Sequence, residues 1–344
     1  MHSELNRYPG GNVASRWTID EFPWLDRDLT GTPEARVIVD NDFAGDPDDL
    51  YHVVHHLLTP SVDTPLLVAS HLAVGDRWDP SGHSAANAAT VLGKTLELMG
   101  LDPADRVVTG SEVALTDRTT PQDTPAARAI IDEAMRKSDT PLYYAAGGGL
   151  TDLASAYLLE PRIADRLTLV WIGGPEYAGH AFPPDGKLDP EYNLNIDVTA
   201  AQVLFNDSTM PIWQVPRNMY RQCLVSDTEL RRRVKTKGPL GEHLYQALRE
   251  VALATGLLRS ETYALGDQPL ILLTGLQSFF QPDTTSSDYE VLPAPLVQDS
   301  GRFVPTHTGR AIRVYTRIDV RLMFEDMFLR LDEFAEWLYS DTRP

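Results

Sequence analysis

The sequence predicts an α/β fold: an open, mostly parallel, Rossmann-like twisted sheet with helices on both faces. Short apolar runs alternate with longer runs of helical spacing, which is the pattern of consecutive βαβ units. Four of the apolar runs lead into a Gly or an Asp, at Asp40, Gly75, Gly147 and Gly173. Because ligands of open α/β sheets bind at the carboxyl ends of the strands, we expect these four loops to share one crevice.

The first half of the chain follows this alternation closely. The run 37–39 is apolar and β-branched, as buried strands are, and it leads to a run of helical spacing that ends at Leu58. Residues 84–99 have a clear helical pattern, which Gly100 stops. The same reasoning predicts further strands at 65–71, 107–108, 142–146 and 167–172, and helices at 126–135 and 151–159.

The second half predicts fewer strands and more helix. Its expected elements are a helix at 198–206, a strand at 211–215, mostly helix at 227–255, an apolar helix opened by Asp267, irregular chain or short hairpins at 282–311, a strand at 312–318 and a closing amphipathic helix at 320–337. Residues 1–35 are polar and punctuated by Pro and Gly, so we treat them as an N-terminal extension. No linker interrupts the remainder, so residues 36–344 are expected to form a single domain.

Composition excludes several functions. The formal net charge of -19 and the pI of about 4.8 argue against nucleic acid as a partner, because phosphate binding needs clustered Lys and Arg. A single cysteine, Cys223, excludes an internal disulfide and a thiolate metal cluster. No apolar stretch has the length of a signal peptide core or of a membrane span. We therefore expect a cytoplasmic protein without a membrane partner.

The strongest chemical signal is a cluster of five carboxylates within ten residues, Asp40, Asp42, Asp46, Asp48 and Asp49. A solvated acidic loop with one helix cap is the simpler interpretation. A solvated loop seldom follows a buried strand with acids at alternate positions, however, and so many close carboxylates repel one another unless a cation offsets them. Oxygen-only ligands favour Ca²⁺ or Mg²⁺.

The cluster also resembles the opening DxDxxxDD signature of the inosine–uridine-preferring nucleoside hydrolases. Three later segments resemble that family in the same order: the GGGLTD segment and its helix at 147–163, the EYN segment at 190–207, and the GDQPL segment at 266–270. The resemblance covers roughly residues 36–340. One such motif is weak, whereas four in order are specific.

The resemblance implies hydrolysis of the N-glycosidic bond of a ribonucleoside, with Ca²⁺ holding the nucleophilic water and the ribose hydroxyls. Ca²⁺ also suits the set better than Mg²⁺, because it accepts seven or eight oxygens. The family's metal ligands fall on Asp42, Asp49, the Gly147 carbonyl and Asp267, and Asp42 also matches the general base. The family's ribose-binding groups fall on Asp48, Glu191 and Asn193. Relatives assemble as homodimers or homotetramers, which extends that expectation to this chain.

Several positions depart from the family pattern. Five residues, rather than three, separate Asp42 from the acid pair, and they include Asp46. We expect Asp40 to orient the metal ligands from behind, whereas Asp46 is either behind them, a ligand itself, or solvated. Asp76 replaces an Asn and is either a substrate contact or a turn residue. Asn195 either reaches the substrate or belongs to buried structure.

The departing base poses a separate question, because Gly266 stands where members that accept both inosine and uridine have a His. Trp78 follows the second strand and either stacks on the base or anchors its own loop. The candidate proton donors to the base are His83, His180, Tyr220 and Tyr263. The histidines of the first helix are interpreted as surface or packing residues away from the strand ends, namely His52, His55 and His56.

Two other functions fit parts of the sequence. The missing His and the longer turn suit a non-catalytic ribose- or nucleoside-binding protein of the same fold. A phosphatase of the haloacid-dehalogenase type also opens with Asp-x-Asp, but Ala44 replaces its usual Thr or Val. That reading also leaves the later segments unexplained, so an N-ribohydrolase is the leading hypothesis.

Overall fold

A computed structural model describes residues 15–19, 21–25, 32–183, 190–255, 261–276 and 287–339. Its centre is an eight-stranded sheet with the order β3-β2-β1-β4-β5-β6-β12-β9. Every neighbouring pair is parallel except β12 and β9. The strands are β1 (Ala35–Asn41), β2 (Val62–Ala69), β3 (Val107–Thr109), β4 (Leu142–Ala146), β5 (Leu167–Ile172), β6 (Ile212–Val215), β9 (Asp288–Pro293) and β12 (Ala311–Arg317).

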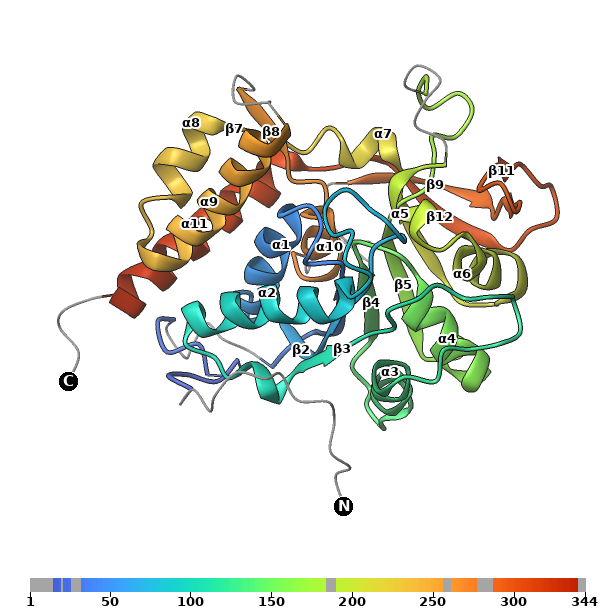
Figure 1. Cartoon of the computed structure of the whole chain (residues 1–344), viewed down its shortest axis with the longest axis horizontal. Helices are drawn as coiled ribbons and strands as arrows, with labels where there is room; N and C mark the ends of the chain where they lie inside the picture. The colour runs from blue at the N-terminus through green and yellow to red at the C-terminus, as the bar shows by residue number, and fades with distance from the viewer. Residues whose placement is uncertain are drawn as a thin grey trace.

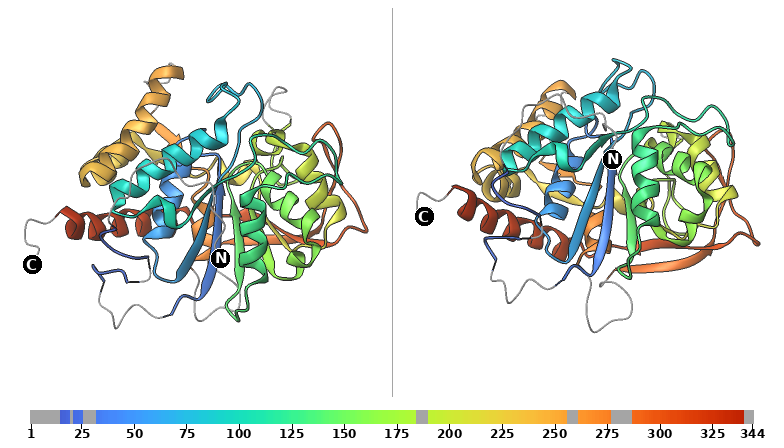
Figure 2. Two further views of the ribbon diagram at one scale, coloured as in Figure 1. Left: turned by 60° about the horizontal axis from the view of Figure 1, so that its bottom comes forward. Right: turned by 90° about the horizontal axis from the view of Figure 1, so that it is seen from below.

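Helices cover both faces of this sheet (Figure 1). One layer contains α1 (Asp48–Leu57), α2 (Ser84–Met99), α9 (Gly238–Thr255), α10 (Pro269–Thr274) and α11 (Val320–Tyr339). The other contains α3 (Pro125–Met135), α4 (Thr151–Leu159) and α6 (Val198–Gln202). Figure 2 shows the strands running between the two groups of helices. The predicted α/β architecture is therefore confirmed.

The two faces of β1 explain why three successive residues at its centre, Val37 to Val39, are all apolar. Val37 and Val39 belong to the core under α1, α2, α10 and α11, whereas Ile38 belongs to the core under α3 and α4. Side chains of a strand alternate between faces, so a strand covered by helices on both sides needs apolar residues throughout. All three side chains are fully buried. β1 is consequently fixed in register, and so are the acids that follow it.

Short elements complete the chain around this framework. They are α5 (Tyr192–Ile196), α7 (Arg217–Tyr220), α8 (Asp227–Glu229), 3₁₀ turns at 103–105 and 161–165, and π-helical turns at 203–207 and 230–234. Two small antiparallel pairs join β7 (Leu224–Ser226) with β8 (Thr262–Ala264), and β10 (Leu296–Val297) with β11 (Phe303–Val304).

Most predicted elements occur within a few residues of their expected bounds. The helix α2 has the predicted limits, and Gly100 follows it with a left-handed φ of 77°, a conformation that glycine adopts without strain. The region 282–311 differs from the prediction, because its residues 288–293 form the edge strand β9 of the main sheet. A strand at the edge of a sheet needs only one buried face. The mixed polarity of residues 288–293 therefore did not indicate a strand. Residues 282–286 lie outside the described residues.

Aromatic residues from the N-terminal region pack on the outside of the α11 layer. The Trp17 ring makes edge contacts with Trp24 and Phe334, at centroid distances of 4.9 and 5.8 Å. The Trp17 indole also donates a hydrogen bond of 2.7 Å to the Met99 carbonyl at the end of α2. Trp17 and Phe334 are both buried. The segment around Trp17 thus joins the ends of two helices that are far apart in sequence.

No helix within the described ranges combines the length with the apolar character that crossing a membrane requires.

We predict that Trp17→Ala lowers the free energy of unfolding by about 3–5 kcal/mol, because it empties a buried aromatic site. Urea unfolding followed by fluorescence of the remaining tryptophans and by circular dichroism measures the change. The control is Leu329→Ala on α11, whose side chain is 51% exposed and whose loss should cost less than about 0.5 kcal/mol. Equal effects of the two substitutions would contradict the docking of Trp17.

Candidate active site

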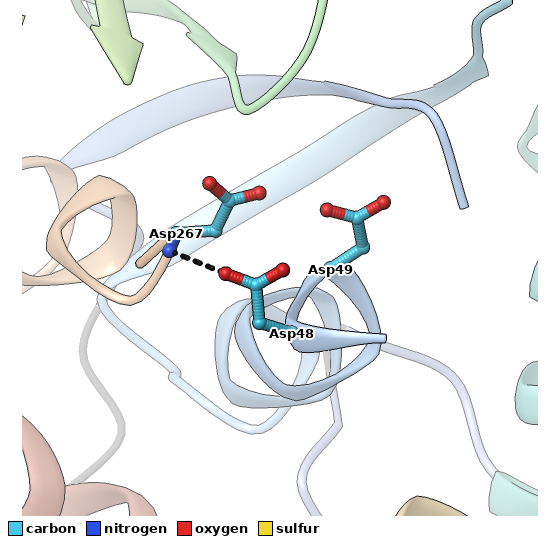
Figure 3. Close-up of side chains that lie close together, drawn as sticks. All are labelled: Asp48, Asp49 and Asp267. Carbon is cyan, nitrogen blue, oxygen red and sulfur yellow. Dashed lines mark hydrogen bonds between the residues drawn. The ribbon is translucent and has the colours of Figure 1, made fainter. Parts of the chain in front are cut away.

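Two segments far apart in sequence bring three carboxylates together at the carboxyl edge of the sheet (Figure 3). Asp48 and Asp49 form the first turn of α1, where the helix dipole favours negative charge. Asp267 precedes α10, and its backbone N–H donates a hydrogen bond of 3.2 Å to Asp48 Oδ2. One carboxylate oxygen from each of these three residues lies within 4.8 Å of the others. Residues 219 positions apart in sequence therefore meet at one point.

Asn41, the last residue of β1, holds two of these carboxylates in place. Its amide Nδ2 donates to Asp49 Oδ1 at 2.7 Å and also to Asp267 Oδ2. The amide is completely buried. A neutral donor between two carboxylates offsets part of their mutual repulsion without adding a charge. Asn41 was not among the residues predicted for the site, although it lies between Asp40 and Asp42 in the acidic run.

Gly147 follows β4 beside the same carboxylates. A Cβ atom at this position would overlap Asp267 Oδ2 and Asn41 Nδ2, so the close approach of the backbone requires glycine. The Gly147 carbonyl accepts a hydrogen bond of 2.7 Å from Asn193 Nδ2. A carbonyl has two lone pairs, so this bond leaves one available. Gly147 also lines the cavity onto which the carboxylates open.

Burial raises the pKa of every carboxyl group in this cluster. For Asp42 and Asp49 burial is the largest cause, and neighbouring carboxylates raise the pKa further. Burial also raises the pKa of Asp267 to about 7. Asp42 Oδ2 and Asp49 Oδ2 are buried and have no hydrogen-bond partner among the described residues. Closely spaced, buried and unpartnered oxygens of this kind fit a hard divalent cation.

Asp40 lies behind the cluster on β1. It is buried and accepts a hydrogen bond from the Tyr144 hydroxyl. Burial, and then the charge of Asp152, raise its pKa to about 8. Its side chain therefore faces β4 and the α4 layer rather than the cavity in front of Asp42.

The cluster opens into a cavity of about 160 Å³, whose lining includes Asp42, Arg77, Glu191, Asn193 and Tyr220. Glu191 is 1% exposed and caps α5 through its bonds to the Asn193 and Leu194 N–H groups. Glu191 also accepts a hydrogen bond of 2.7 Å from the Tyr220 hydroxyl. Loops after β1, β2, β4 and β5 thus contribute to one cavity.

A second, larger cavity of about 590 Å³ shares Asp46 and Arg77 with the first. Trp78, Tyr245 and Tyr263 are among its other lining residues. The Arg77 guanidinium lies 4.8 Å from the centre of the Trp78 ring. The Tyr263 hydroxyl donates a hydrogen bond of 2.7 Å to Asp46 Oδ1. The inserted acid therefore stands where the two cavities meet.

Several candidate residues lie at the rim or outside. Asp76 accepts two hydrogen bonds of 2.9 Å, one from the Tyr192 hydroxyl and one from the Trp78 backbone N–H. It therefore joins two loops at the rim. Asn195 is exposed and does not line the 160 Å³ cavity as described. His83 precedes α2, and His180 lies 3.2 Å from Glu290. Neither histidine lines either cavity among the described residues.

The histidines of α1 correct one expectation. His52, His55 and His56 are at most 1% exposed, so of the two expected alternatives they are packing residues rather than surface residues. His52 is also not remote from the strand ends, because its Nε2 lies 2.8 Å from Asn41 Oδ1. The sequence spacing of His52 and His56, one helical turn apart, places them on one face. It did not reveal that this face points at the end of β1.

The fold and the oxygen cluster together define an α/β protein with a buried acidic site suited to a hard cation, at the carboxyl edge of a parallel sheet. Within that class the chain belongs to the inosine-uridine preferring nucleoside hydrolase family, whose model matches residues 37–277.

Individual relatives agree with this assignment. An inosine-uridine preferring nucleoside hydrolase from Leishmania major is 39% identical over 84 residues, which are 24% of this chain and 25% of that protein. The chain therefore aligns with about a quarter of the length of this curated relative. Two solved structures show the same fold. One is a plant nucleoside hydrolase with 19% sequence identity and a TM-score of 0.65, and the match covers 87% of this chain and 99% of that one. The other is a purine-preferring ribonucleoside hydrolase from Gardnerella vaginalis with 19% sequence identity and a TM-score of 0.66, and the match covers 88% of this chain and 99% of that one.

We predict that Ca²⁺ at a hundred times its Kd raises the free energy of unfolding by about 2.7 kcal/mol, because it binds the folded state alone. Asp49→Asn should abolish this gain. Without metal, the same variant should be at least as stable as the wild type, because one of several repelling charges is gone. Thermal unfolding with Ca²⁺ and with a chelator measures both effects.

The control for this experiment is Asp132→Asn, which removes an exposed carboxylate of α3 and should retain the full gain. A Ca²⁺ effect that survives in Asp49→Asn would place the cation elsewhere.

Proposed function

We propose that the protein hydrolyses the N-glycosidic bond of a ribonucleoside or related N-riboside, with Ca²⁺ as its cofactor and ribose and the free base as products. One observation carries the proposal beyond family membership. Asp42 is buried at the cavity with an unpartnered Oδ2, beside Asp49 and Asp267. A carboxylate without a bonding partner in a polar cavity is available to accept a proton from water.

The reaction assigns roles to the lining residues. Asp42 takes a proton from water as the water oxygen bonds to the anomeric carbon. The bond to the base breaks, and its electron pair leaves with the base. Asp48, Glu191 and Asn193 bind the ribose hydroxyls, and the carboxylates stabilise the oxocarbenium-like sugar. When bound by Asp42, Asp49, Asp267 and the Gly147 carbonyl, Ca²⁺ supplies the positive charge that lowers the pKa of water and orients the diol.

Asp42→Asn should lower kcat by about 10²–10⁴-fold, because the amide cannot act as the general base. The Kd of a nucleoside in saturating Ca²⁺ should change much less, since Asn keeps the shape of the side chain. Release of free ribose from a panel of purine and pyrimidine nucleosides measures turnover. Asp165→Asn, which changes an exposed acid, is the control and should behave like the wild type.

The same panel tests the alternative, a non-catalytic ribose- or nucleoside-binding protein of the same fold. Nucleoside binding by wild type and by Asp42→Asn, without ribose release by either, would establish that alternative and refute the hydrolase.

The second cavity supports a site for the departing base. Trp78 offers an aromatic face there, and base–aromatic stacking is favourable for every base. Among the four proton donors considered from sequence, Tyr263 lies where the cavities meet and Tyr220 lines the first. Burial, then Asp46, raise the pKa of Tyr263, so it keeps its proton at neutral pH. Both hydroxyls donate to a carboxylate, Tyr263 to Asp46 and Tyr220 to Glu191. We assign Tyr263 as the proton donor to the base, because it lines the second cavity together with Trp78, whereas Tyr220 lines only the first.

Tyr263→Phe should lower kcat/KM for nucleosides by about 10²-fold or more, since general acid catalysis is lost. It should leave 4-nitrophenyl riboside hydrolysis almost unchanged, because that leaving group departs without a proton. The ratio of the two rates is the measurement. Tyr245→Phe is the matched control, since Tyr245 lines the same cavity but donates to Asp227. A parallel loss on both substrates would assign Tyr263 a structural role.

Assembly as a homodimer or homotetramer, and a cytoplasmic location, stay predictions.

A further inference from the structure

His52 is a buried polar side chain that the reaction described above does not use. It lies on the second turn of α1, fully buried, and its ring joins the carboxylate cluster to the interior of the helix layer. Nε2 lies 2.8 Å from Asn41 Oδ1. On the other side, Nδ1 lies 3.3 Å from His56 Nδ1. The ring therefore connects two polar partners on opposite sides.

The carboxylates determine the direction of the first bond. Asn41 Nδ2 has two N–H groups, and they face Asp49 Oδ1 and Asp267 Oδ2. The reverse orientation would place the amide oxygen against two carboxylate oxygens, which is repulsive. Asn41 Oδ1 consequently faces His52, and an oxygen there can only accept. His52 must therefore carry its proton on Nε2.

His56 determines the state of the other His52 nitrogen. His56 Nδ1 lies 3.0 Å from the His52 backbone carbonyl, which can only accept, so His56 carries its proton on Nδ1. This N–H also faces His52 Nδ1, which must then be bare. Burial lowers the pKa of both rings, that of His56 to about 3, so each ring is neutral with one proton. The Asn41 amide therefore sets the His52 proton on Nε2 and leaves its Nδ1 bare toward His56.

We propose that His52 is a positioning residue that fixes the Asn41 amide, so that both N–H groups hold Asp49 and Asp267 in place for the cation. The inference rests on the proposed Ca²⁺ site. It extends that site to a chain of fixed donors that runs from His56 through His52 and Asn41 to the two carboxylates. Each carboxylate has one oxygen held by the amide, and Asp49 Oδ2 is left unpartnered among the described residues.

Without the His52 donor, Asn41 Oδ1 becomes a buried acceptor with no donor, a state that costs free energy. The amide can then rotate, and the two carboxylates lose a common donor and repel one another. The site would need to be reorganised each time a cation binds. Groups that orient metal ligands in this way contribute about 10–100-fold to metal affinity.

Calorimetric titration with Ca²⁺ alone tests the proposal. His52→Phe keeps the ring but has no donor, and its Kd for Ca²⁺ should rise by about 10–100-fold. His52→Gln carries an amide N–H that can replace Nε2–H, so it should restore most of the affinity. Val53→Ala is the control for lost stability, because Val53 is fully buried on the same helix and belongs to the apolar core. Its Kd should stay at the wild-type value.

The outcomes separate this inference from the proposed function. Wild type that binds Ca²⁺ no better than His52→Phe, with both affinities measurable, overturns the positioning role and leaves the hydrolase intact. An equal loss in Val53→Ala also overturns it, because the effect then follows stability. Wild type that binds no Ca²⁺ refutes the proposed cofactor, and the inference with it.

A spectroscopic measurement reports on the proton directly. Nitrogen-15 NMR of the wild type with labelled histidine distinguishes the protonated from the bare nitrogen of each ring. We expect His52 with its proton on Nε2 and His56 with its proton on Nδ1, in the presence and in the absence of Ca²⁺. The opposite tautomer at His52 would overturn the proposal even if His52→Phe bound Ca²⁺ weakly.

Discussion

Repulsion among buried carboxylates is the constraint on which this structure depends. Asp40, Asp42, Asp48, Asp49 and Asp267 are all buried at one end of the sheet. Two like charges 4 Å apart repel by about 4 kcal/mol at an effective dielectric constant of 20, while a whole domain is stable by about 5–15 kcal/mol. A few such pairs would cancel the free energy of folding. The chain therefore needs groups at the same place that offset the repulsion among the carboxylates.

The fold provides that compensation from parts that serve other purposes. The N-terminus of α1 faces Asp48 and Asp49, the Asp267 N–H bonds Asp48, and Asn41 bonds Asp49 and Asp267. These groups are held in place because β1 lies between two apolar cores and cannot shift its register. Burial, and after it the neighbouring carboxylates, still raise the pKa of Asp42 and Asp49. A buried acidic site of this kind favours cation binding, so the cluster that costs stability is also suited to the proposed cofactor.

Sequence reasoning succeeded where the signal was local and failed where it was tertiary. The apolar run of β1, the helix before Gly100 and the order of the acidic motifs each depend on neighbouring residues, and each predicted its structure. The contact of His52 with Asn41 joins residues on α1 and β1. The hydrophobic periodicity of neither element predicts it. Asn195 was expected either to reach the substrate or to belong to buried structure, yet it is exposed. The tertiary arrangement, rather than the spacing, decides which polar residues of a segment face the cavity.

Two of the departures from the family pattern meet in space. The longer turn after Asp42 adds Asp46, and Asp46 bonds Tyr263, three residues before the glycine that replaces the family's His. At Gly266 a Cβ would lie 3.3 Å from the Tyr220 ring and 3.4 Å from Asp48, so these two side chains are the nearest neighbours of that position. With Tyr263 as the proposed proton donor, the leaving group is activated from the second cavity rather than from Gly266. The Asp46–Tyr263 pair stands at the boundary between the two cavities, so one change in the turn and one at Gly266 become parts of the same rearrangement.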